Sequence, residues 1–251
     1  MDSTANTHSE NYSAYKLALV IPFYNEEKRI MVDSFAGFVI NNKDILFVLV
    51  NDGSTDRTDE ILQAIHSDTA GRNTEVVSLP KNTGKGNAIR AGMLKVLHYN
   101  IPFIAYIDGD LSTPFEEILR LYNYFSGTDT IAVLGSRLKK LDSNIKRSLF
   151  RHISGRIIAT IIDSRFRIGC YDTQCSAKIF RRDPLQSVIQ EPFYTRWFFD
   201  VELLLRLRKK MGPFKALEVP LNTWEHKPGS KINALSVFSI TKELYTLFAK
   251  Y

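Results

Sequence analysis

Four times in the first half of the chain, a short apolar run is followed by a polar turn and then by a segment with helical spacing. The apolar runs cover residues 17–21, 45–50, 75–79 and 103–107. A fifth apolar run at 131–137 extends the series. Short apolar strands that alternate with helices are typical of a parallel sheet with helices on both faces. The pattern predicts an α/β fold with a mostly parallel sheet.

Each of the first four strands is followed by an unusual polar cluster. The clusters read "YNEE", "NDGSTD", "NTGKG" and "DGD". In open parallel sheets, ligands bind at the carboxyl ends of the strands. We therefore expect the four clusters to lie at one edge of the sheet and to form a single site.

The "DGD" cluster places Asp108 and Asp110 on either side of Gly109. Like charges this close repel each other unless a positive charge lies near them. The glycine allows a tight turn, so both carboxylates can face one ion, and Mg2+ or Mn2+ suits such oxygen ligands. Two alternatives are a solvated turn and the Asp-x-Asp-x-Thr nucleophile motif of haloacid-dehalogenase-type phosphatases, which normally follows the first strand of its fold.

The second and third clusters carry weaker signals. Asp52 could accept hydrogen bonds from a nucleobase imide or a ribose hydroxyl. Ser54 or Thr55 is expected to cap the helix that follows, and Asp56 to favour its amino end. Lys85 lies between two glycines at a helix start, from where it could reach a diphosphate. Its surroundings match neither a P-loop nor a dinucleotide fingerprint.

The segment from 137 to 167 is strongly basic, with nine Lys or Arg and two Asp in a chain whose formal net charge is +6. Within it, isoleucine or leucine recurs every four residues at 145, 149, 153, 157 and 161. This spacing predicts an amphipathic helix with a cationic face. One interpretation is contact with an anionic membrane surface, and the other is a helix whose isoleucines pack into the core.

Length and composition agree with one catalytic domain, since 251 residues with 44% hydrophobic content can bury a full core. The first sixteen residues are polar and lack the pattern of a signal peptide. No apolar run reaches the ~18 to 20 residues that span a bilayer. We expect a cytoplasmic or peripheral membrane protein. Cys170 and Cys175 are expected to be free buried thiols.

The motifs "IPFYNE", "VNDGSTD", "NTGKGNA" and "DGD", in this order, resemble the inverting family 2 glycosyltransferases with the GT-A fold. The later motifs "DTQCSAKIF", "RWFFDVELL" and "PGSKIN" resemble the dolichyl-phosphate glucose synthases and their mannose-synthase relatives. The resemblance implies a Rossmann-like GT-A domain over 17–233. It would comprise a nucleotide-sugar half (17–136) and an acceptor half (137–233), with a polar leader (1–16) and a C-terminal helix (234–251).

The resemblance also implies roles for individual residues. Donor-site residues would bind the base, ribose and diphosphate of a UDP- or GDP-hexose, and these are Pro22, Tyr24, Asn25, Glu26, Asp52, Gly53, Lys85, Gly86, Asp108 and Gly109. Asp108 and Asp110 would hold Mg2+ or Mn2+. Basic and polar residues would bind an acceptor phosphate, and these are Arg137, Arg151, Ser154, Lys178 and Lys231. His226 could contact the donor diphosphate, and Ser112 could bridge to the metal through water.

Asp200 occupies the position of the family's catalytic acidic residue. A phosphate monoester has a second pKa near ~6, so a polyprenyl phosphate is largely anionic at neutral pH and needs little deprotonation. A hydroxyl acceptor would need Asp200 as a true base. The resemblance therefore favours hexose transfer to a polyprenyl or dolichyl phosphate, without nucleic acid partners. The alternatives are a family 2 enzyme with a hydroxyl acceptor, an Asp-nucleophile phosphatase, and a silent nucleotide- or lipid-binding module.

Overall fold

The structure, a computed structural model, describes residues 15–146, 149–227 and 234–251, and excludes the side chains of 149–151 and 234–238. The described residues form one seven-stranded sheet, in the order β3-β2-β1-β4-β7-β5-β8, and one two-stranded sheet. The strands of the larger sheet are β1 (Leu17–Phe23), β2 (Ile45–Asn51), β3 (Thr74–Ser78), β4 (Phe103–Tyr106), β5 (Ala132–Ser136), β7 (Lys178–Arg181) and β8 (Ala216–Pro220). The smaller sheet pairs β6 (Asn144–Lys146) with β9 (Thr223–Glu225).

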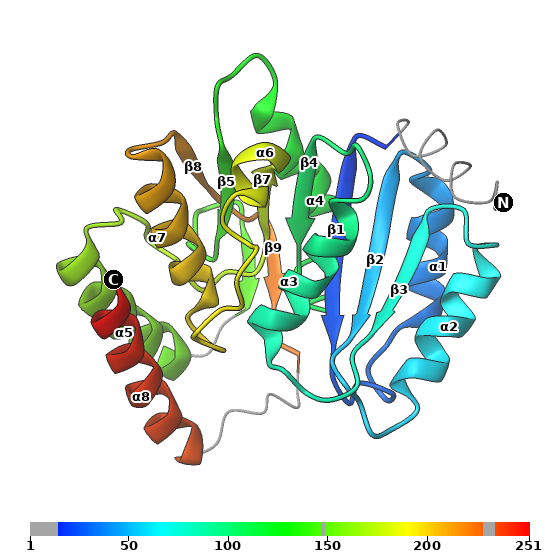
Figure 1. The fold of residues 1–251 in the computed structure, drawn as a ribbon, viewed down its shortest axis with the longest axis horizontal. Helices are drawn as coiled ribbons and strands as arrows, with labels where there is room; N and C mark the ends of the chain where they lie inside the picture. The colour runs from blue at the N-terminus through cyan, green and yellow to red at the C-terminus, as the bar shows by residue number, and fades with distance from the viewer. Residues whose placement is uncertain (1–14, 147–148, 228–233) are drawn as a thin grey trace, which may run out of the picture. The chain divides into compact units, whose positions relative to one another are not determined.

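Helices alternate with these strands along the chain, as Figure 1 shows. They are α1 (Val32–Asn41), α2 (Thr58–Asp68), α3 (Lys85–Val96), α4 (Phe115–Tyr122), the short 3-10 helix η1 (Asn123–Phe125), α5 (Leu149–Phe166), α6 (Arg182–Gln186), α7 (Phe199–Met211) and α8 (Ala234–Lys250). The prediction of an α/β fold with a mostly parallel sheet flanked by helices is confirmed.

The chain forms two compact units, and the first contains the residues up to Asp110 together with Phe180–Gln190. In this unit β1 pairs in parallel with both β2 and β4, and β2 pairs in parallel with β3. Every residue of β2 is buried, as expected for a continuous apolar run in the middle of a covered sheet. Helix α3 packs on β1 and β2. The parallel register sets the carboxyl ends of these four strands at one edge.

The second unit contains Leu111–Ile179 and Glu191–Tyr251. Here β5 and β8 pair in parallel, and three helices pack together beside them. Ile162 and Phe166 of α5 meet Val201 and Leu205 of α7, and Leu247 of α8 completes the buried cluster. The units divide the chain after Asp110, whereas the functional halves expected from the resemblance divide after residue 136, so those halves stay a prediction.

Helix α5 differs from its prediction in two respects. It begins at Leu149, and Ile145 belongs to strand β6. The row of isoleucines at 153, 157 and 161 is exposed, whereas the neighbouring row of Ile158, Ile162 and Phe166 packs against α7 and α8. The helix carries two adjacent apolar rows, and the three-helix contact buries only one of them. The interpretation in which the isoleucines pack into the core therefore holds for Ile158 and Ile162 and is wrong for Ile153, Ile157 and Ile161.

The start of α2 also differs from its prediction. The helix begins at Thr58 rather than directly after Ser54 or Thr55. The Ser54 hydroxyl instead accepts the backbone N–H of Asn25. Asp56 accepts the N–H and hydroxyl of Thr58 and the N–H of Glu27. Burial alone would raise the pKa of Asp56, but these hydrogen bonds lower it below its ordinary value.

Both cysteines are free thiols, as predicted, but Cys175 is buried whereas Cys170 is only half-buried. Burial raises the pKa of Cys170 to about 12 and that of Cys175 to about 11, so both stay protonated at neutral pH. Within the described ranges, no helix has the length and apolar character needed to cross a bilayer.

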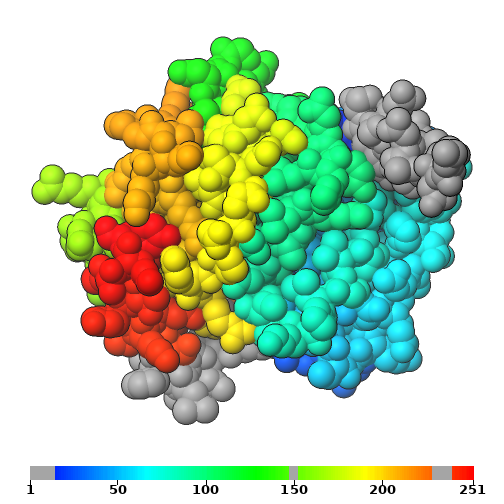
Figure 2. All heavy atoms as spheres, in the orientation of Figure 1, coloured from blue at the N-terminus to red at the C-terminus, as the bar shows by residue number. Residues whose placement is uncertain are grey.

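A buried carboxylate on α8 holds the segment that leads into α7. One oxygen of Glu243, Oε2, accepts the backbone N–H of Arg196 at 2.9 Å and that of Trp197 at 2.7 Å. In Figure 2 the red atoms of α8 lie against the yellow segment before α7. Burial raises the pKa of Glu243 above its ordinary value, although the N–H groups partly oppose this. The folded state therefore binds the Glu243 proton more tightly than the unfolded state does.

We predict that Glu243→Gln keeps this contact and removes its dependence on pH. A single amide oxygen can accept both N–H groups, whereas Glu243→Ala leaves them without that acceptor and should cost about 1–3 kcal/mol. Because the folded pKa of Glu243 is raised, its contribution to stability falls as pH rises above its ordinary value of 4.5. Urea unfolding at about pH 5 and about pH 8 should show a smaller fall for Glu243→Gln than for the wild type. Equal losses in the Gln and Ala variants would contradict the contact.

Candidate functional site

The loops that follow β1 and β2 are joined by hydrogen bonds in the first unit. The side-chain oxygen of Asn25 accepts the Thr55 N–H at 2.8 Å, and the Ser54 hydroxyl accepts the Asn25 N–H at 3.0 Å. The Glu26 N–H also donates to the hydroxyl of Thr58. Asn25 has a positive φ of 51°, a backbone conformation that asparagine tolerates better than most residues. The "YNEE" and "NDGSTD" clusters therefore meet, as the strand pattern predicted.

Asp52 joins the β2 loop to the amino end of α3. Its buried carboxylate accepts the Thr83 N–H at 2.7 Å, the Thr83 hydroxyl at 2.8 Å and the Gly84 N–H at 3.0 Å. Gly53 beside it has φ 65°, and a Cβ there would lie 2.3 Å from the backbone of Lys81. The two loops thus approach each other so closely that only glycine fits. Asp52 holds the loop that leads into Lys85.

Asp108 and Asp110 each meet one cation. Lys85, the first residue of α3, forms an ion pair with Asp108. Arg29, from the β1 loop, lies 3.0 Å from an oxygen of Asp110 and 3.1 Å from Glu26. A Cβ on Gly109 would lie 2.6 Å from the ring of Phe23, so the turn packs directly on the end of β1. These pairs link the loops after β1, β3 and β4.

The acidic pair fits a divalent cation. Both carboxylates remain partly exposed, with side-chain exposures of 33% for Asp108 and 23% for Asp110. The described part of the chain contains no group of three or more His, Cys, Asp or Glu side chains that could hold a metal. Mg2+ is commonly bound through one or two carboxylates together with water and substrate phosphates. Asp108 and Asp110 suit that kind of coordination, in which a phosphorylated ligand supplies further oxygens.

The remaining predicted donor residues follow the same strands. Pro22 lies within β1, and Tyr24 comes directly after it. Gly86 is buried in the first turn of α3. Leu111, next to Asp110 in the chain, has φ 52°, which is unusual for a bulky residue. Strained backbone of this kind often occurs at functional sites.

Arg137 and Asp172 form a paired site in the second unit. The guanidinium donates two hydrogen bonds of 2.7 Å to the carboxylate, and the Arg137 backbone N–H donates a third at 3.0 Å. Glu218 supports the pair because it accepts the N–H groups of Tyr171 and Asp172. The Arg137 guanidinium also lies 5.3 Å from the centre of the Trp224 ring. The sequence had indicated no role for Asp172, although this residue begins the motif "DTQCSAKIF".

Lys178 and Asp200 form a buried ion pair in the same unit. The Lys178 ammonium lies 2.5 Å from the carboxylate, and their side chains are 0% and 4% exposed. The ammonium also donates to the backbone oxygens of Thr173, at 3.0 Å, and Cys175. The Lys178 ammonium therefore contacts three oxygen atoms of the protein, whereas it was expected to bind the phosphate of the substrate that accepts the sugar. In this structure Lys178 orients Asp200 and the turn at 173–175.

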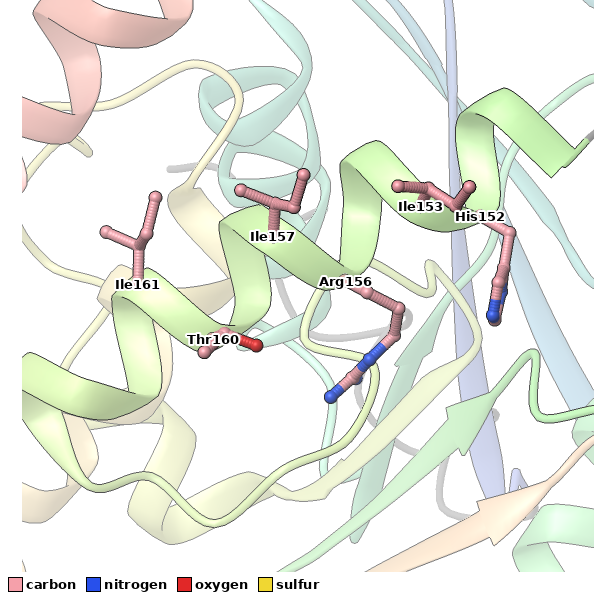
Figure 3. A pocket seen from close by; sticks show the side chains of 6 residues that line it. All are labelled: His152, Ile153, Arg156, Ile157, Thr160 and Ile161. Atoms are coloured by element: carbon pink, nitrogen blue, oxygen red, sulfur yellow. The ribbon is translucent and has the colours of Figure 1, made fainter.

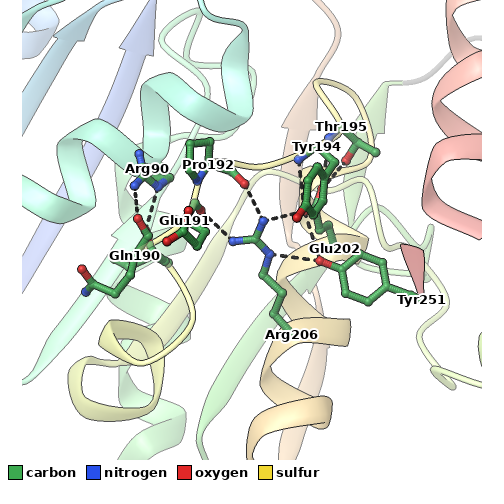
Figure 4. A network of polar contacts seen from close by, with 10 residues as sticks. Arg90, Gln190, Glu191, Pro192, Tyr194, Thr195, Glu202, Arg206 and Tyr251 are labelled. Carbon is green, nitrogen blue, oxygen red and sulfur yellow. Dashed lines mark hydrogen bonds and ion pairs between the residues drawn. The ribbon is translucent and has the colours of Figure 1, made fainter. Parts of the chain in front are cut away.

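Glu202 faces away from Asp200, as their spacing on a helix requires. Figure 4 shows its contacts at the start of α7. Glu202 accepts the N–H groups of Tyr194 and Thr195 and forms an ion pair of 2.7 Å with Arg206. Burial tends to lower the pKa of Arg206, but the Tyr251 hydroxyl and the charge of Glu202 raise it above its ordinary value. This network fixes the segment before α7.

The other predicted residues are Ser154, His226 and Ser112, together with two whose side chains lie outside the described regions. Ser154 is half-buried on α5, and the side chain of Arg151 and all of Lys231 lie outside the described residues. His226 stacks on Trp224, with ring centres 6.4 Å apart. Ser112 is buried, and its backbone oxygen accepts the Glu225 N–H. Arg29 was missed by sequence reasoning, although its place in the loop after β1 could have indicated a partner for the acidic pair.

Comparison with known proteins agrees with this geometry. The model of the family described as glycosyl transferase family 2 matches residues 18–189. The chain is 29% identical to a dolichyl-phosphate beta-glucosyltransferase of Dictyostelium discoideum, over 88% of this chain and 69% of the relative. It is 30% identical to a dolichyl-phosphate beta-glucosyltransferase of Trichomonas vaginalis, over 91% of this chain and 71% of that relative.

Among solved structures, the fold is similar to that of glucosyl-3-phosphoglycerate synthase from Mycobacterium tuberculosis. The TM-score is 0.69 and the sequence identity 18%, over 95% of this chain and 81% of the other. That structure contains Mn2+, uridine diphosphate and glucosyl-3-phosphoglycerate. At this identity the likeness concerns the fold, which is GT-A. The family match, the two relatives and the fold together show that the chain is a hexosyltransferase belonging to glycosyltransferase family 2.

Proposed function

We propose that the chain transfers glucose from UDP-glucose to a polyprenyl phosphate, with inversion at the anomeric carbon. The observation that carries the donor half is the acidic pair Asp108 and Asp110, held with Lys85 and Arg29 at the carboxyl ends of parallel strands. Support for glucose and for a lipid phosphate comes from the relatives, which are named dolichyl-phosphate beta-glucosyltransferases.

The donor would bind to the loops of the first unit. Pro22, Tyr24, Asn25 and Glu26 line the base and ribose, and Asp52 with Gly53 holds the loop that presents Lys85 and Gly86 to the diphosphate. Asp108 and Asp110 would hold Mg2+ or Mn2+, which when bound would neutralise charge on the diphosphate. Lys85 exchanges its contact with Asp108 for a phosphate oxygen of the leaving group.

The reaction needs an anionic nucleophile and a good leaving group. An oxygen of the acceptor phosphate attacks the anomeric carbon from the face opposite UDP, and a new carbon–oxygen bond forms. The bond to the diphosphate breaks, and UDP departs with the electron pair. The acceptor oxygen is already anionic at neutral pH, so no strong base is required. Positioning by cationic groups then contributes more to the rate than deprotonation does.

We assign the acceptor phosphate to Arg137, with Arg151, Ser154 and Lys231 as further contacts. The Arg137 guanidinium is held in a fixed orientation by Asp172 and lies over the Trp224 ring, and its planar cationic group suits the oxygens of a phosphate. Lys178 and Asp200 act indirectly on the phosphate, through Arg137. Their buried ion pair fixes the 173–175 turn, which lies next to Asp172, the partner of Arg137. Asp200 is then a positioning residue for a phosphate acceptor rather than its base.

The full chain should form a lipid product only with one class of donor and acceptor. Purified protein with Mn2+ is incubated with UDP-glucose, UDP-N-acetylglucosamine, GDP-glucose or GDP-mannose, each with a short polyprenyl phosphate or the matching polyprenol. We expect glucosyl lipid from UDP-glucose and the phosphate alone, measured by donor consumption and by mass of the lipid product. Transfer to the polyprenol but not to the phosphate would overturn the proposed acceptor.

Removal of one metal ligand should suppress transfer without unfolding the protein. We expect Asp110→Asn to lower kcat/KM by at least about a hundredfold, because charge on the leaving diphosphate is then less well neutralised. Chelation by EDTA should abolish wild-type activity, and added Mn2+ should restore it. Asp44→Asn is the matched control, because Asp44 pairs with Lys16 in the same unit but at an exposed position. Equal activity of the Asp110 and Asp44 variants would contradict the metal site.

A double-mutant cycle should separate positioning from base catalysis at Asp200. Lys178→Met or Asp200→Asn alone should destabilise the protein by about 3–5 kcal/mol, because either change leaves a buried charge without its partner. The double variant should lose clearly less than the sum, as measured by urea unfolding. In its folded fraction, Asp200→Asn should retain transfer to the lipid phosphate within about tenfold. A loss above a thousandfold in folded Asp200→Asn, with little loss in Lys178→Met, would identify Asp200 as the base.

A further inference from the structure

One face of α5 exposes three large apolar side chains in a row. Ile153, Ile157 and Ile161 are 49%, 55% and 39% exposed. Figure 3 shows them projecting from the same side of the helix, whereas His152 and Arg156, which line the same surface hollow, point to the other side. The opposite side of α5 is already used, because Ile162 and Phe166 pack against α7 and α8. We refer to Ile153, Ile157 and Ile161 as the isoleucine row.

Basic residues border the isoleucine row on both sides. Counting 100° per residue, Arg156 lies on one flank of the row, beside Asp163, and Arg165 lies on the other. The segment from 137 to 167 carries nine basic and two acidic residues. An apolar row between cationic flanks matches a surface that is apolar below and anionic above, which is the layering at the headgroup boundary of an anionic bilayer.

We propose that α5 lies flat on an anionic bilayer surface, with the isoleucine row inserted among the acyl chains and the exposed Arg165 at the headgroups. A helix in this position buries its apolar face without spanning the membrane. The occupant is a lipid surface rather than a protein because an anionic bilayer offers acyl chains to the isoleucine row and negative headgroups to the basic segment at the same time. A second copy of this chain would bring the same positive charge to the contact.

The same helix is joined to the Arg137 site within its unit. The Arg156 guanidinium lies 3.8 Å from the centre of the Tyr171 ring and donates to the backbone oxygen of Tyr171. The next residue, Asp172, holds Arg137. This step rests on the proposed function: a polyprenyl phosphate stays anchored in the bilayer, so docking through α5 would hold the Arg137 loop close to the lipid headgroups.

Vesicle binding tests the docking surface without any enzymatic activity. The full chain is sedimented with sucrose-loaded vesicles of phosphatidylcholine, with and without phosphatidylserine. We expect binding to the anionic vesicles that weakens at high salt, because the Debye length then shortens. Ile157→Glu should weaken this binding by about tenfold or more, since it removes one inserted side chain and adds a negative charge.

Ile40→Glu is the matched control, because Ile40 is 53% exposed on α1 in the other unit. Thermal unfolding should show that both variants remain folded. Equal vesicle binding by the two variants would overturn the proposal. Loss of a concentration-dependent dimer in Ile157→Glu, with vesicle binding unchanged, would assign the isoleucine row to a second copy and would also overturn it.

Activity separates this inference from the proposed function. With a short, water-soluble acceptor phosphate, Ile157→Glu should transfer glucose like the wild type, whereas with a long polyprenyl phosphate in anionic vesicles it should lose activity in parallel with binding. If the wild type binds vesicles through Ile157 but transfers no sugar to any lipid phosphate, the proposed function fails and the docking surface stands. If Ile157→Glu is fully active on the vesicle-borne acceptor, the docking surface fails and the proposed function stands.

Discussion

The repulsion between Asp108 and Asp110 is the constraint around which the first unit is organised. Two carboxylates separated by one glycine repel each other, and nearby positive charge relieves that repulsion. Lys85 reaches Asp108 from the start of α3, and Arg29 reaches Asp110 from the loop after β1. Asp52 in turn fixes the segment just before Lys85. The acidic pair thus depends directly on the loops after β1 and β3 and indirectly on the loop after β2, and a cation or phosphate that binds there must exchange partners with residues already in place.

The second unit matches its buried charges in a similar way. Arg137 pairs with Asp172, Lys178 with Asp200 and Arg206 with Glu202, and each pair also has backbone hydrogen bonds. Pairing of this kind is required wherever a charge is removed from water. The pairs fix the segments at 171–176 and 191–198, which lie between or before the helices of the three-helix cluster. A rigid frame of this kind can hold Arg137 ready for an anionic acceptor.

Helix α5 packs against the protein on one side and exposes apolar side chains on another. It has two adjacent apolar rows, and α7 and α8 cover only one of them. A stripe of apolar residues wider than its packing partner leaves large side chains in contact with solvent. Exposed apolar patches on soluble proteins commonly mark interaction surfaces. The basic residues beside the isoleucine row favour an anionic bilayer as the surface that it would contact.

The sequence by itself determined the order of strands and helices, the parallel character of the sheet and the gathering of the "YNEE", "NDGSTD", "NTGKG" and "DGD" loops. These follow from the local period of apolar residues and from the rule that parallel strands end at a common edge. Tertiary structure alone decided the partners of the charged residues. The sequence could not show that Lys178 is enclosed by three acceptors, that Arg29 pairs with Asp110 across 81 residues, or which isoleucines of α5 meet solvent. Those outcomes depend on which segments pack together, and a helical period records that a face is apolar but not whether another element covers it.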